Sequence, residues 1–438
     1  MSALDAAMIP ANAVDPETGL LVHDEGSWTN WEPLELGAGS GVMRAREGYR
    51  YRIACYGAEY DEALAHEYCY EPESNWTTIA SCTEPGVWLD GPSSFSRDCF
   101  VRITVQRVDG FLAVRPYKLD EMIELNYVPP AAPPQPAWAR AEAERVAARV
   151  AGLREPGDLV LIALSDVHYS TGCIWPQTAC NVHAVADLIH PDAIVQLGDV
   201  GDGVAPISVT RSFVGRVLGD LRSCGVPVFS CVGNHDFNYF KGNDERLSKK
   251  ECVQLYLERE KSWYFEDFPA ARLRCVFLDS FDPSRRLRYG FAGREVRWLR
   301  RTLRATPRDW KLLVFSHVPP LPEIHYWSDV IENGPRVMRM LESRNRCCSQ
   351  SVLAFVHGHS HVDQVYRKQS FPIVSIGCAK FEDFTENKPE GSTTYKRQLG
   401  TASQDLWDVI VVKANEGKLH FVRFGAGEDR EVAPNGER

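Results

Sequence analysis

The 438-residue sequence lacks any unbroken apolar run of about 18 residues, the length that a membrane-crossing helix requires. Its first residues, MSALDAAMIPANAVDPETG, also lack a basic start followed by a long apolar core, so we expect no secretory signal. Together the two absences predict a cytoplasmic protein with no membrane partner.

The 13 cysteines are odd in number and include no Cys-x-x-Cys pair. Disulfide frameworks and structural zinc sites usually show even numbers or close pairs, so neither is expected here. Buried thiols in a reducing compartment fit better. The adjacent Cys347 and Cys348 leave a redox role open beside simple core filling.

An excess of positive charge is also missing, because 49 Lys and Arg face 59 Asp and Glu and the net charge is −10. Phosphate backbones are bound by clustered Lys and Arg, so nucleic acid is a disfavoured partner, although a local basic patch would still permit it. The hydrophobic share of 44% and charged share of 25% are those of a globular protein. The length allows at least two domains.

The first part of the chain has the alternating pattern of β-strands. Apolar and polar residues alternate over 49–55 and again over 99–106, with turn sequences such as EPGVW and VDGF between the runs. This pattern predicts a small β-rich, sandwich-like domain over residues 1–128.

A proline-rich segment follows, reading PPAAPPQP over 129–136. Dense proline favours an extended polyproline conformation and disrupts helices and sheets. A short helix is predicted over 138–153, with Val146, Val150 and Leu153 on one face. We therefore interpret residues 129–157 as a linker with a short helix.

From Asp158 onward, short β-branched apolar runs alternate with helical or loop stretches. The runs are DLVLIAL, DAIVQL, PVFSCV, LRCVFL, KLLVF and VLAFV. Such unbroken runs are typical of strands buried on both faces, and their spacing predicts an α/β layered domain over 158–438.

Five of these runs lead directly into short polar motifs. In chain order the motifs are SDVH at Asp166 and His168, GDVGD at Asp199, GNHD at Asn234 and His235, SH at His317, and GHSH at His359 and His361. Strand ends in α/β folds meet at one edge, so these side chains should share one site. A carboxylate can bridge two cations, and a mixed N/O set without thiolates suits Mn, Fe, Zn or similar ions.

Each motif alone has an ordinary structural explanation. An Asp after Gly caps a helix or forms a turn, GNHD can form a tight turn, and His317 alone would fit a hydrogen-bonded core histidine. The metal hypothesis rests on all five motifs occurring in order after predicted buried strands.

The ordered motifs resemble those of the calcineurin-like metallophosphoesterase superfamily over residues of about 158–425. The resemblance implies a two-sheet sandwich flanked by helices, with two divalent or trivalent metal ions at the sheet edge. By matching positions, one ion would be held by Asp166, His168 and His361, and the other by Asn234, His317 and His359, with Asp199 bridging them. His235 would be catalytic, and the carboxylate of Asp202 would orient it.

The implied reaction is hydrolysis of a phosphate ester by a hydroxide that bridges the two ions, with His235 as the acid. Protein phosphatases of the family resemble GDxVDRG and GNHE rather than GDVGDG and GNHD, and the tyrosine ligand of purple phosphatases has no match here. We therefore expect a phosphodiester, or else a small phosphomonoester, rather than a phosphoprotein.

Three segments that follow motifs should form the rim of the substrate pocket, namely 169–181, 237–250 and 318–334. Their aromatic and basic residues would contact substrate, although packing between loops explains them equally well. The sequence GREVRWLRRTLRATPR predicts a helix with Val296, Leu299 and Leu303 toward the core. Its arginines form either a solvated face or a contact with an acidic surface.

Two other functions remain open at this point. One is a metal-binding scaffold that does not turn over substrate. The other is an adhesion or assembly role in which the N-terminal domain binds a glycan or a protein through aromatics such as Trp28, Trp31, Trp76 and Trp88.

Overall fold

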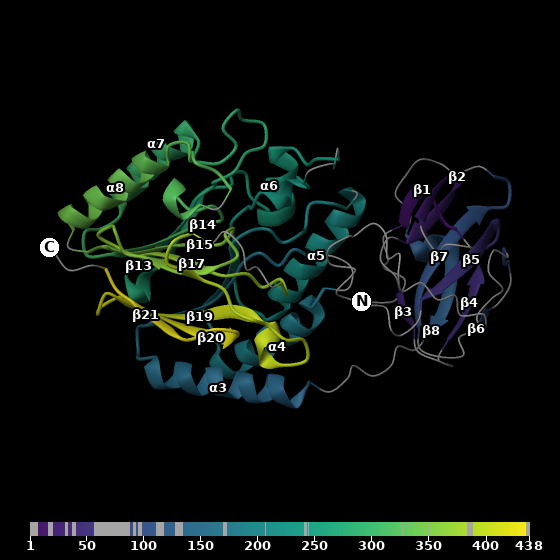
Figure 1. The fold of residues 1–438 in the computed structure, drawn as a ribbon, viewed down its shortest axis with the longest axis horizontal. Helices are drawn as coiled ribbons and strands as arrows, with labels where there is room; N and C mark the ends of the chain where they lie inside the picture. Colours follow the sequence, from purple (N-terminus) through teal and green to yellow (C-terminus); the bar gives the residue numbers. More distant parts are fainter. Residues whose placement is uncertain are drawn as a thin grey trace. The chain divides into compact units, whose positions relative to one another are not determined.

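A computed structural model describes residues 8–15, 21–30, 34–36, 41–56, 88–90, 93–94, 99–110, 118–127, 135–169, 173–205, 207–240, 243, 245–325, 327–348, 350–382 and 389–434. The chain forms two compact units, the first mainly residues 1–134 and the second mainly residues 135–438 (Figure 1). Segments 170–173 and 205–213 group with the first unit. The predicted bounds 1–128, 129–157 and 158–438 stay a prediction.

The N-terminal unit is built from two small antiparallel sheets. The larger contains β1 (Met8–Val14), β2 (Leu21–Asn30), β7 (Cys99–Arg107), β3 (Leu34–Leu36) and β5 (Tyr49–Tyr56). The smaller contains β6 (Ser93–Ser94), β4 (Gly41–Ala45) and β8 (Ile123–Tyr127), and the short helix α2 (Leu119–Met122) precedes β8. The expected β-rich region is therefore present, with β5 and β7 at the two alternating segments.

The core of this unit contains Trp28, which is 2% exposed and therefore offers no surface for glycan stacking. Trp88 is half-buried and carries the guanidinium of Arg52 3.9 Å above its ring centroid. Trp31 and Trp76, like the Asn-Trp-Thr sequon at Asn75, lie outside the described residues. Core packing thus accounts for Trp28.

The C-terminal unit contains two larger mixed sheets. The six-stranded sheet has the order β11 (Val228–Ser230), β10 (Ala193–Gln196), β9 (Leu159–Leu164), β19 (Leu406–Lys413), β20 (Lys418–Gly425) and β21 (Arg430–Val432). The seven-stranded sheet has the order β12 (Tyr264–Phe268), β13 (Leu273–Phe277), β14 (Lys311–Ser316), β15 (Val352–His357), β17 (Ile373–Ile376), β16 (Asp363–Tyr366) and β18 (Ser392–Thr393).

The two sheets enclose one hydrophobic core between them. Leu161, Val195 and Ile410 come from the first sheet, and Phe315 and Val356 come from the second. Of the six strands at the predicted apolar runs, β9, β10, β13 and β15 are completely buried, as expected for strands covered on both faces, whereas β11 and the start of β14 are partly exposed. The expected two-sheet sandwich is the fold of this unit.

Helices cover the outer faces of this sandwich (Figure 1). On the six-stranded side lie α3 (Ala137–Leu153) and α4 (Trp175–Ile189), and on the seven-stranded side lie α7 (Gly293–Ala305) and α8 (Gly334–Cys347). The remaining helices are α5 (Ile207–Ser223), α6 (Lys249–Leu257) and the short η1 (His235–Phe237), η2 (Pro269–Ala271), η3 (Pro322–Ile324) and η4 (Ala402–Gln404).

The helix patterns predicted from the sequence agree with this arrangement. Val146 and Val150 of α3 are buried, and so are Val296, Leu299 and Leu303 of α7. The exposed face of α7 carries the arginines, as in the solvated-face interpretation. Among the described helices, none combines the length and the apolar character that crossing a bilayer needs.

The strand register brings the motifs to one edge. β9, β10 and β11 are parallel, and the ends of β9 and β11 pair with the end of β10, with Gln196 opposite Leu164 and Ser230. β14 and β15 are also parallel, and Ser316 pairs with His357. Every predicted motif begins within a few residues of one of these strand ends, so the fold itself gathers the motifs.

Candidate metal centre

Main-chain hydrogen bonds join the loops of the first two motifs. The N–H of Asp166 donates to the carbonyl of Gly198 at 3.0 Å, and the N–H of His168 donates to the carbonyl of Asp199 at 3.0 Å. The fifth motif joins them, because the N–H of His359 donates to the Asp166 carboxylate at 2.9 Å. Residues far apart in sequence are thereby fixed beside one another.

Five of the seven predicted ligands have left-handed backbone conformations. Their φ values are 54° at Asp166, 44° at His168, 52° at Asp199, 67° at His359 and 53° at His361. Such values are uncommon for residues other than glycine and are costly by about 1 kcal/mol or more each. This strain persists because buried strands fix both sides of each loop, a pattern typical of functional sites.

The motif glycines are required by close packing. A Cβ on Gly233 would lie 2.1 Å from Asp199 Oδ1, and a Cβ on Gly358 would lie 1.8 Å from Ser165 Oγ. No side chain fits at either position without moving the ligand loops. The glycines therefore let the ligand loops approach each other.

The first candidate cluster consists of Asp166, His168 and His361. Asp166 Oδ1 lies 3.3 Å from His361 Nε2 and 3.8 Å from His168 Nε2. The two histidine nitrogens lie 3.1 Å apart. All three groups point to one small volume that a single cation would fill.

The second candidate cluster consists of Asn234, His317 and His359. His317 Nε2 lies 3.1 Å from Asn234 Oδ1 and 3.1 Å from His359 Nδ1. Asp199 belongs to both clusters, because its Oδ2 is 3.1 Å from His317 Nε2 and 3.7 Å from His168 Nε2. The structure therefore brings all seven predicted ligands together, with Asp199 in the middle.

The polar atoms at this centre fit metal ions. Asp166 Oδ1 is buried and has no hydrogen-bond partner among the described residues, which is costly unless a cation contacts it. In each of the two facing histidine pairs the ring nitrogens lie 3.1 Å apart, so two imidazole donors are close enough together to bind one cation. Carboxylate, amide oxygen and imidazole are suitable donors for Mn, Fe or Zn.

The charges of the centre favour a bound cation as well. Burial alone would lower the pKa of His317, but the carboxylates of Asp199 and Asp166 raise it to about 9. Burial would raise the pKa of Asp199, yet His317 and His235 hold it at about 2. Burial lowers the pKa of His168 to about 4, so its ring is neutral near pH 7 and keeps a lone pair for a ligand bond.

His235 borders the centre, and one of its ring nitrogens lies within 4.8 Å of donor atoms of His168 and Asp199. Its main-chain N–H donates to Asp199 Oδ1 at 2.8 Å, and its ring Nδ1 bonds the main-chain carbonyl of Asp202. The sequence prediction assigned this orienting contact to the carboxylate of Asp202. In the structure the carboxylate instead accepts from the N–H of Val204 at 3.0 Å, so the residue is the expected one but the group is different.

Asp236 organises the same loops, a role that the sequence prediction missed. Its carboxylate is fully buried and accepts from the N–H groups of Asp199, Val200 and Gly233 at 2.7–3.0 Å. Burial and the nearby Asp199 carboxylate raise the pKa of Asp236 to about 7. The only sequence signal was an acidic residue directly after His235.

Two further residues that contact ligands were also missed. The carboxylate of Glu382 accepts a hydrogen bond from His361 Nδ1. His325 Nε2 lies 3.0 Å from His359 Nε2, on the side of that ring away from His317. Neither residue lies in a recognisable motif, since each reaches its ligand only through the tertiary fold.

A cavity of about 470 Å³ opens over the candidate centre. Besides predicted ligands and His235, it is lined by Tyr239, Phe240, Arg246, Tyr289 and Trp327. Segments 237–250 and 318–334 therefore contribute to the rim as the sequence suggested. Tyr169 and Trp175 of segment 169–181 are buried instead, and Trp175 Nε1 donates to Asp220 at 2.9 Å, so packing explains them.

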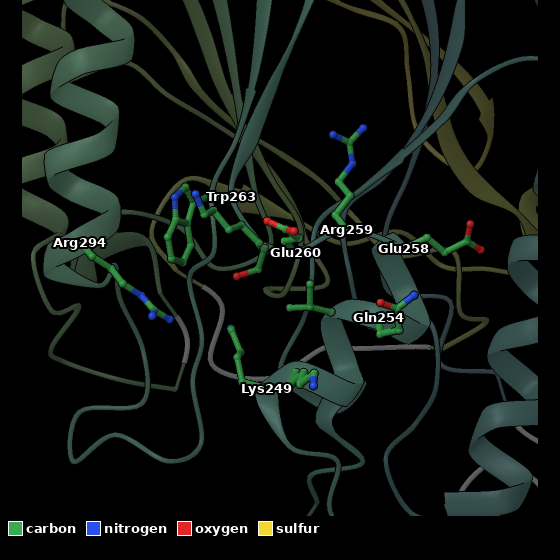
Figure 2. Close-up of a pocket in the computed structure, with 11 residues that line it drawn as sticks. Lys249, Gln254, Glu258, Arg259, Glu260, Trp263 and Arg294 are labelled. Atoms are coloured by element: carbon green, nitrogen blue, oxygen red, sulfur yellow. The ribbon is translucent and has the colours of Figure 1, made fainter.

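A second cavity of about 720 Å³ contains none of the predicted ligands. It lies beside α6, the start of α7 and the segment leading to β12, and Lys249, Trp263 and Arg294 line it (Figure 2). Three of its charged side chains form ion pairs, Lys249 with Asp279, Glu258 with Arg222 and Arg259 with Glu266. The chemistry expected from the motifs belongs to the first cavity, because predicted ligands line that one.

Comparison with known proteins agrees with the motifs and the fold. A curated relative, a manganese-dependent ADP-ribose/CDP-alcohol diphosphatase from Xenopus laevis, is 22% identical over 229 residues, which are 40% of this chain and 62% of the relative. This chain thus matches less than two thirds of the length of that relative.

Two solved structures are similar to this one in part. A dimetal phosphatase from Danio rerio is 17% identical, with a TM-score of 0.49 over 64% of this chain and 100% of that chain. A purple acid phosphatase from yellow lupin is 12% identical, with a TM-score of 0.42 over 98% of this chain and 75% of that chain.

The sequence profile of calcineurin-like phosphoesterases matches residues 159–363. The match begins at β9 and ends just after the GHSH motif, so it includes all five motifs and every predicted ligand. The same residues build most of the two-sheet sandwich that the resemblance implied. Residues 159–363 are therefore identified with the calcineurin-like phosphoesterase family by this match.

Proposed function

We propose that this protein hydrolyses a doubly substituted phosphoryl group, either a phosphodiester or a phosphoanhydride, with two metal ions. The observation that carries the proposal is the position of Asp199. Its Oδ2 lies 3.1 Å from His317 Nε2 and 3.7 Å from His168 Nε2, so a single carboxylate is shared by two ligand clusters. A shared carboxylate is what a two-ion centre requires.

In this proposal Asp166, His168 and His361 hold one ion, and Asn234, His317 and His359 hold the other. Bound there, the two ions would supply an acidified water as nucleophile and neutralise charge on the phosphoryl oxygens. The buried Asp166 Oδ1 supports this assignment, since it accepts no hydrogen bond from the described residues.

His235 is the acid in this proposal. A carbonyl oxygen only accepts hydrogen bonds, so the contact with Asp202 places a proton on Nδ1 of His235. The other ring nitrogen, Nε2, is then available on the side of the cavity that His235 lines. In its protonated form that nitrogen can donate to the leaving oxygen as the bond to phosphorus breaks.

The substrate class follows from two considerations. The motifs GDVGDG and GNHD differ from those of protein phosphatases, which makes a phosphoprotein the less favoured substrate. The relative from Xenopus laevis is described as a diphosphatase, and a diphosphate linkage, like a diester, has a substituent on each side of the phosphorus. Diesters and diphosphates are both doubly substituted phosphoryl groups, so we propose this class as substrate. A phosphomonoester is the alternative substrate.

The test uses metal-free protein reloaded with Mn²⁺, Fe²⁺ or Zn²⁺ and compares bis-p-nitrophenyl phosphate with p-nitrophenyl phosphate. We expect metal-dependent turnover of the diester. His235→Ala should lower kcat by about 100-fold or more, the usual contribution of a general acid, with metal content unchanged. His23→Ala, at an exposed position in the N-terminal unit, is the matched control.

Three results would contradict the proposal. Activity of the metal-free protein would show that the reaction does not need metal ions. Normal activity of His235→Ala would show that His235 is not the acid. Binding of two ions per chain without turnover of any phosphate ester would favour the non-catalytic scaffold.

A further inference from the structure

Two exposed aromatic rings border the cavity above the candidate centre. Phe240, just after η1, and Trp327, just after η3, are each 46% exposed. The Phe240 ring centroid lies 5.4 Å from that of His235, and the Trp327 ring centroid lies 4.7 Å from that of His359. Two large apolar rings that are exposed beside the polar side chains of the candidate metal centre lose contact with water when a bound molecule covers them, which favours binding.

A cation without a carboxylate partner lines the same cavity. The guanidinium of Arg246 lies 4.7 Å from the centroid of the Tyr239 ring, and no carboxylate within the described ranges forms an ion pair with it. Arg288 lies 5.2 Å from the same ring centroid and is likewise without a carboxylate partner among the described residues, but only Arg246 of the two lines the cavity. A guanidinium held over a ring is well suited to binding a phosphate oxygen pair.

We propose that Phe240, Trp327 and Arg246 form a recognition site for a mononucleotide unit that carries a second phosphoryl group. The two rings would stack on the flat base, and Arg246 would bind the phosphoryl group that is not attacked. This inference rests on the proposed function, because it names the substrate class of the same cavity. The cavity volume of about 470 Å³ falls in the range of sites for small ligands.

The charge distribution favours a mononucleotide over a nucleic-acid strand. A strand would need a row of cations to follow its backbone, whereas Arg246 is the one Lys or Arg among the described residues that line this cavity. The net charge of −10 would oppose a long polyanion as well. A short ligand with one base and two phosphoryl groups matches the two aromatic rings, the candidate metal centre and the single arginine that line this cavity.

The first experiment measures binding of AMP and of ribose 5-phosphate to the Mn²⁺-loaded full chain by titration calorimetry. The two probes share sugar and phosphate and differ only in the base. Because stacking on an aromatic side chain strengthens binding by about tenfold per ring, AMP should bind at least about tenfold more tightly. The double variant Phe240→Ala/Trp327→Ala should remove most of this difference.

Phe265→Ala is the matched control for the rings. Phe265 on β12 is 37% exposed, and its ring stacks on Trp298 outside the cavity. This control should keep the preference for AMP. Equal binding of the two probes by the natural protein, or a preference that survives the double variant, would overturn the ring site.

The second experiment compares AMP with α,β-methylene-ADP, which cannot be cleaved between its phosphorus atoms. The natural protein should bind the diphosphate several-fold more tightly, Arg246→Met should abolish that preference, and Arg246→Lys should restore part of it. Arg297→Met, on the exposed face of α7, is the control. No loss of preference in Arg246→Met would overturn the role of Arg246.

Binding and turnover separate the two proposals. If the protein hydrolyses no phosphate ester but shows the expected binding preferences, the proposed function fails and the recognition site stands. If it hydrolyses diesters but binds AMP and ribose 5-phosphate equally, the recognition site fails and the proposed function stands.

Discussion

His361 is held from both sides of its ring. Its Nε2 is directed toward Asp166, at 3.3 Å from Oδ1, while its Nδ1 donates to the carboxylate of Glu382. Burial would raise the pKa of Glu382, but His361 and Lys380 hold it well below its usual value. A charged acceptor at Nδ1 favours the tautomer that carries its proton on Nδ1 and a lone pair on Nε2, which is the form that binds a metal ion.

Glu382→Ala should therefore weaken metal binding by about 10- to 100-fold, the usual effect of removing a carboxylate behind a histidine ligand. Competition with a chelating dye would measure the affinity of each site. The metal affinity of Glu382→Gln, which keeps an acceptor oxygen but not the charge, should lie between that of the natural protein and that of Glu382→Ala. Glu416→Ala is the control, because Glu416 pairs with Lys413 at 3.2 Å and is partly exposed. Unchanged affinity in Glu382→Ala would refute this positioning role.

The hairpin of β19 and β20 carries a buried arginine that forms ion pairs with two buried carboxylates. Arg423 on β20 is 1% exposed and reaches Asp408 on β19 at 2.9 Å and Asp363 on β16 at 2.8 Å. Arg430 also pairs with Asp363, at 3.0 Å, and with Asp408. The network links the two sheets, because β16 belongs to the seven-stranded sheet and β20 to the six-stranded one.

Arg423→Met should destabilise the C-terminal unit by about 3 kcal/mol or more, because among the described residues it leaves Arg430 as the one cation paired with the two buried carboxylates. Urea unfolding of the full chain would measure this as a lower midpoint. Lys418 lies on β20 like Arg423, and Lys418→Met removes its partly exposed pair with Glu431 of β21. This change should alter stability by less than about 1 kcal/mol. Similar midpoints for the two variants would show that the network contributes little.

Elements with strong local patterns were predictable from the sequence. Buried strands such as β9 and β15 consist of unbroken apolar residues, and α7 repeats its apolar residues with helical spacing. Because parallel strand ends share one edge, the motifs after them could be assigned to one site. The candidate ligands Asp166 and His359 were proposed in this way, and the structure places them side by side.

The supporting contacts were not predictable, because they depend on distant chain segments or on main-chain atoms. Glu382 reaches His361 because the N–H groups of Ala379 and Lys380 bond the carbonyls of Ser165 and Asp166. Arg397 also binds the carbonyl of Cys378 at 3.2 Å. The carbonyl of Asp202 has no sequence signature at all, since every residue has one.

The whole molecule contains two compact units, each with a core of its own. Trp28, Tyr51 and Ile103 are central in the first core, and Leu161 and Phe315 in the second. Every predicted metal ligand belongs to the second unit. Metal binding should therefore stabilise one unit and leave the other unchanged.

Scanning calorimetry of the full chain should accordingly show two transitions, of which Mn²⁺ raises only one. At a metal concentration about 100 times the dissociation constant, the stabilisation amounts to about 2.7 kcal/mol. A chain that begins at residue 129 should keep the metal-sensitive transition and lose the other. One transition that shifts as a whole would mean that the two units unfold together.

The left-handed backbone at Asp166 and Asp199 determines how an inert form of the protein should be made. A branched replacement such as Asp199→Val would remove a ligand and also add backbone strain, so lost activity and lost folding would be confused. Asparagine tolerates left-handed conformations and keeps the shape of aspartate. Asp166→Asn and Asp199→Asn are thus the variants with which to capture an uncleaved substrate on an otherwise native surface.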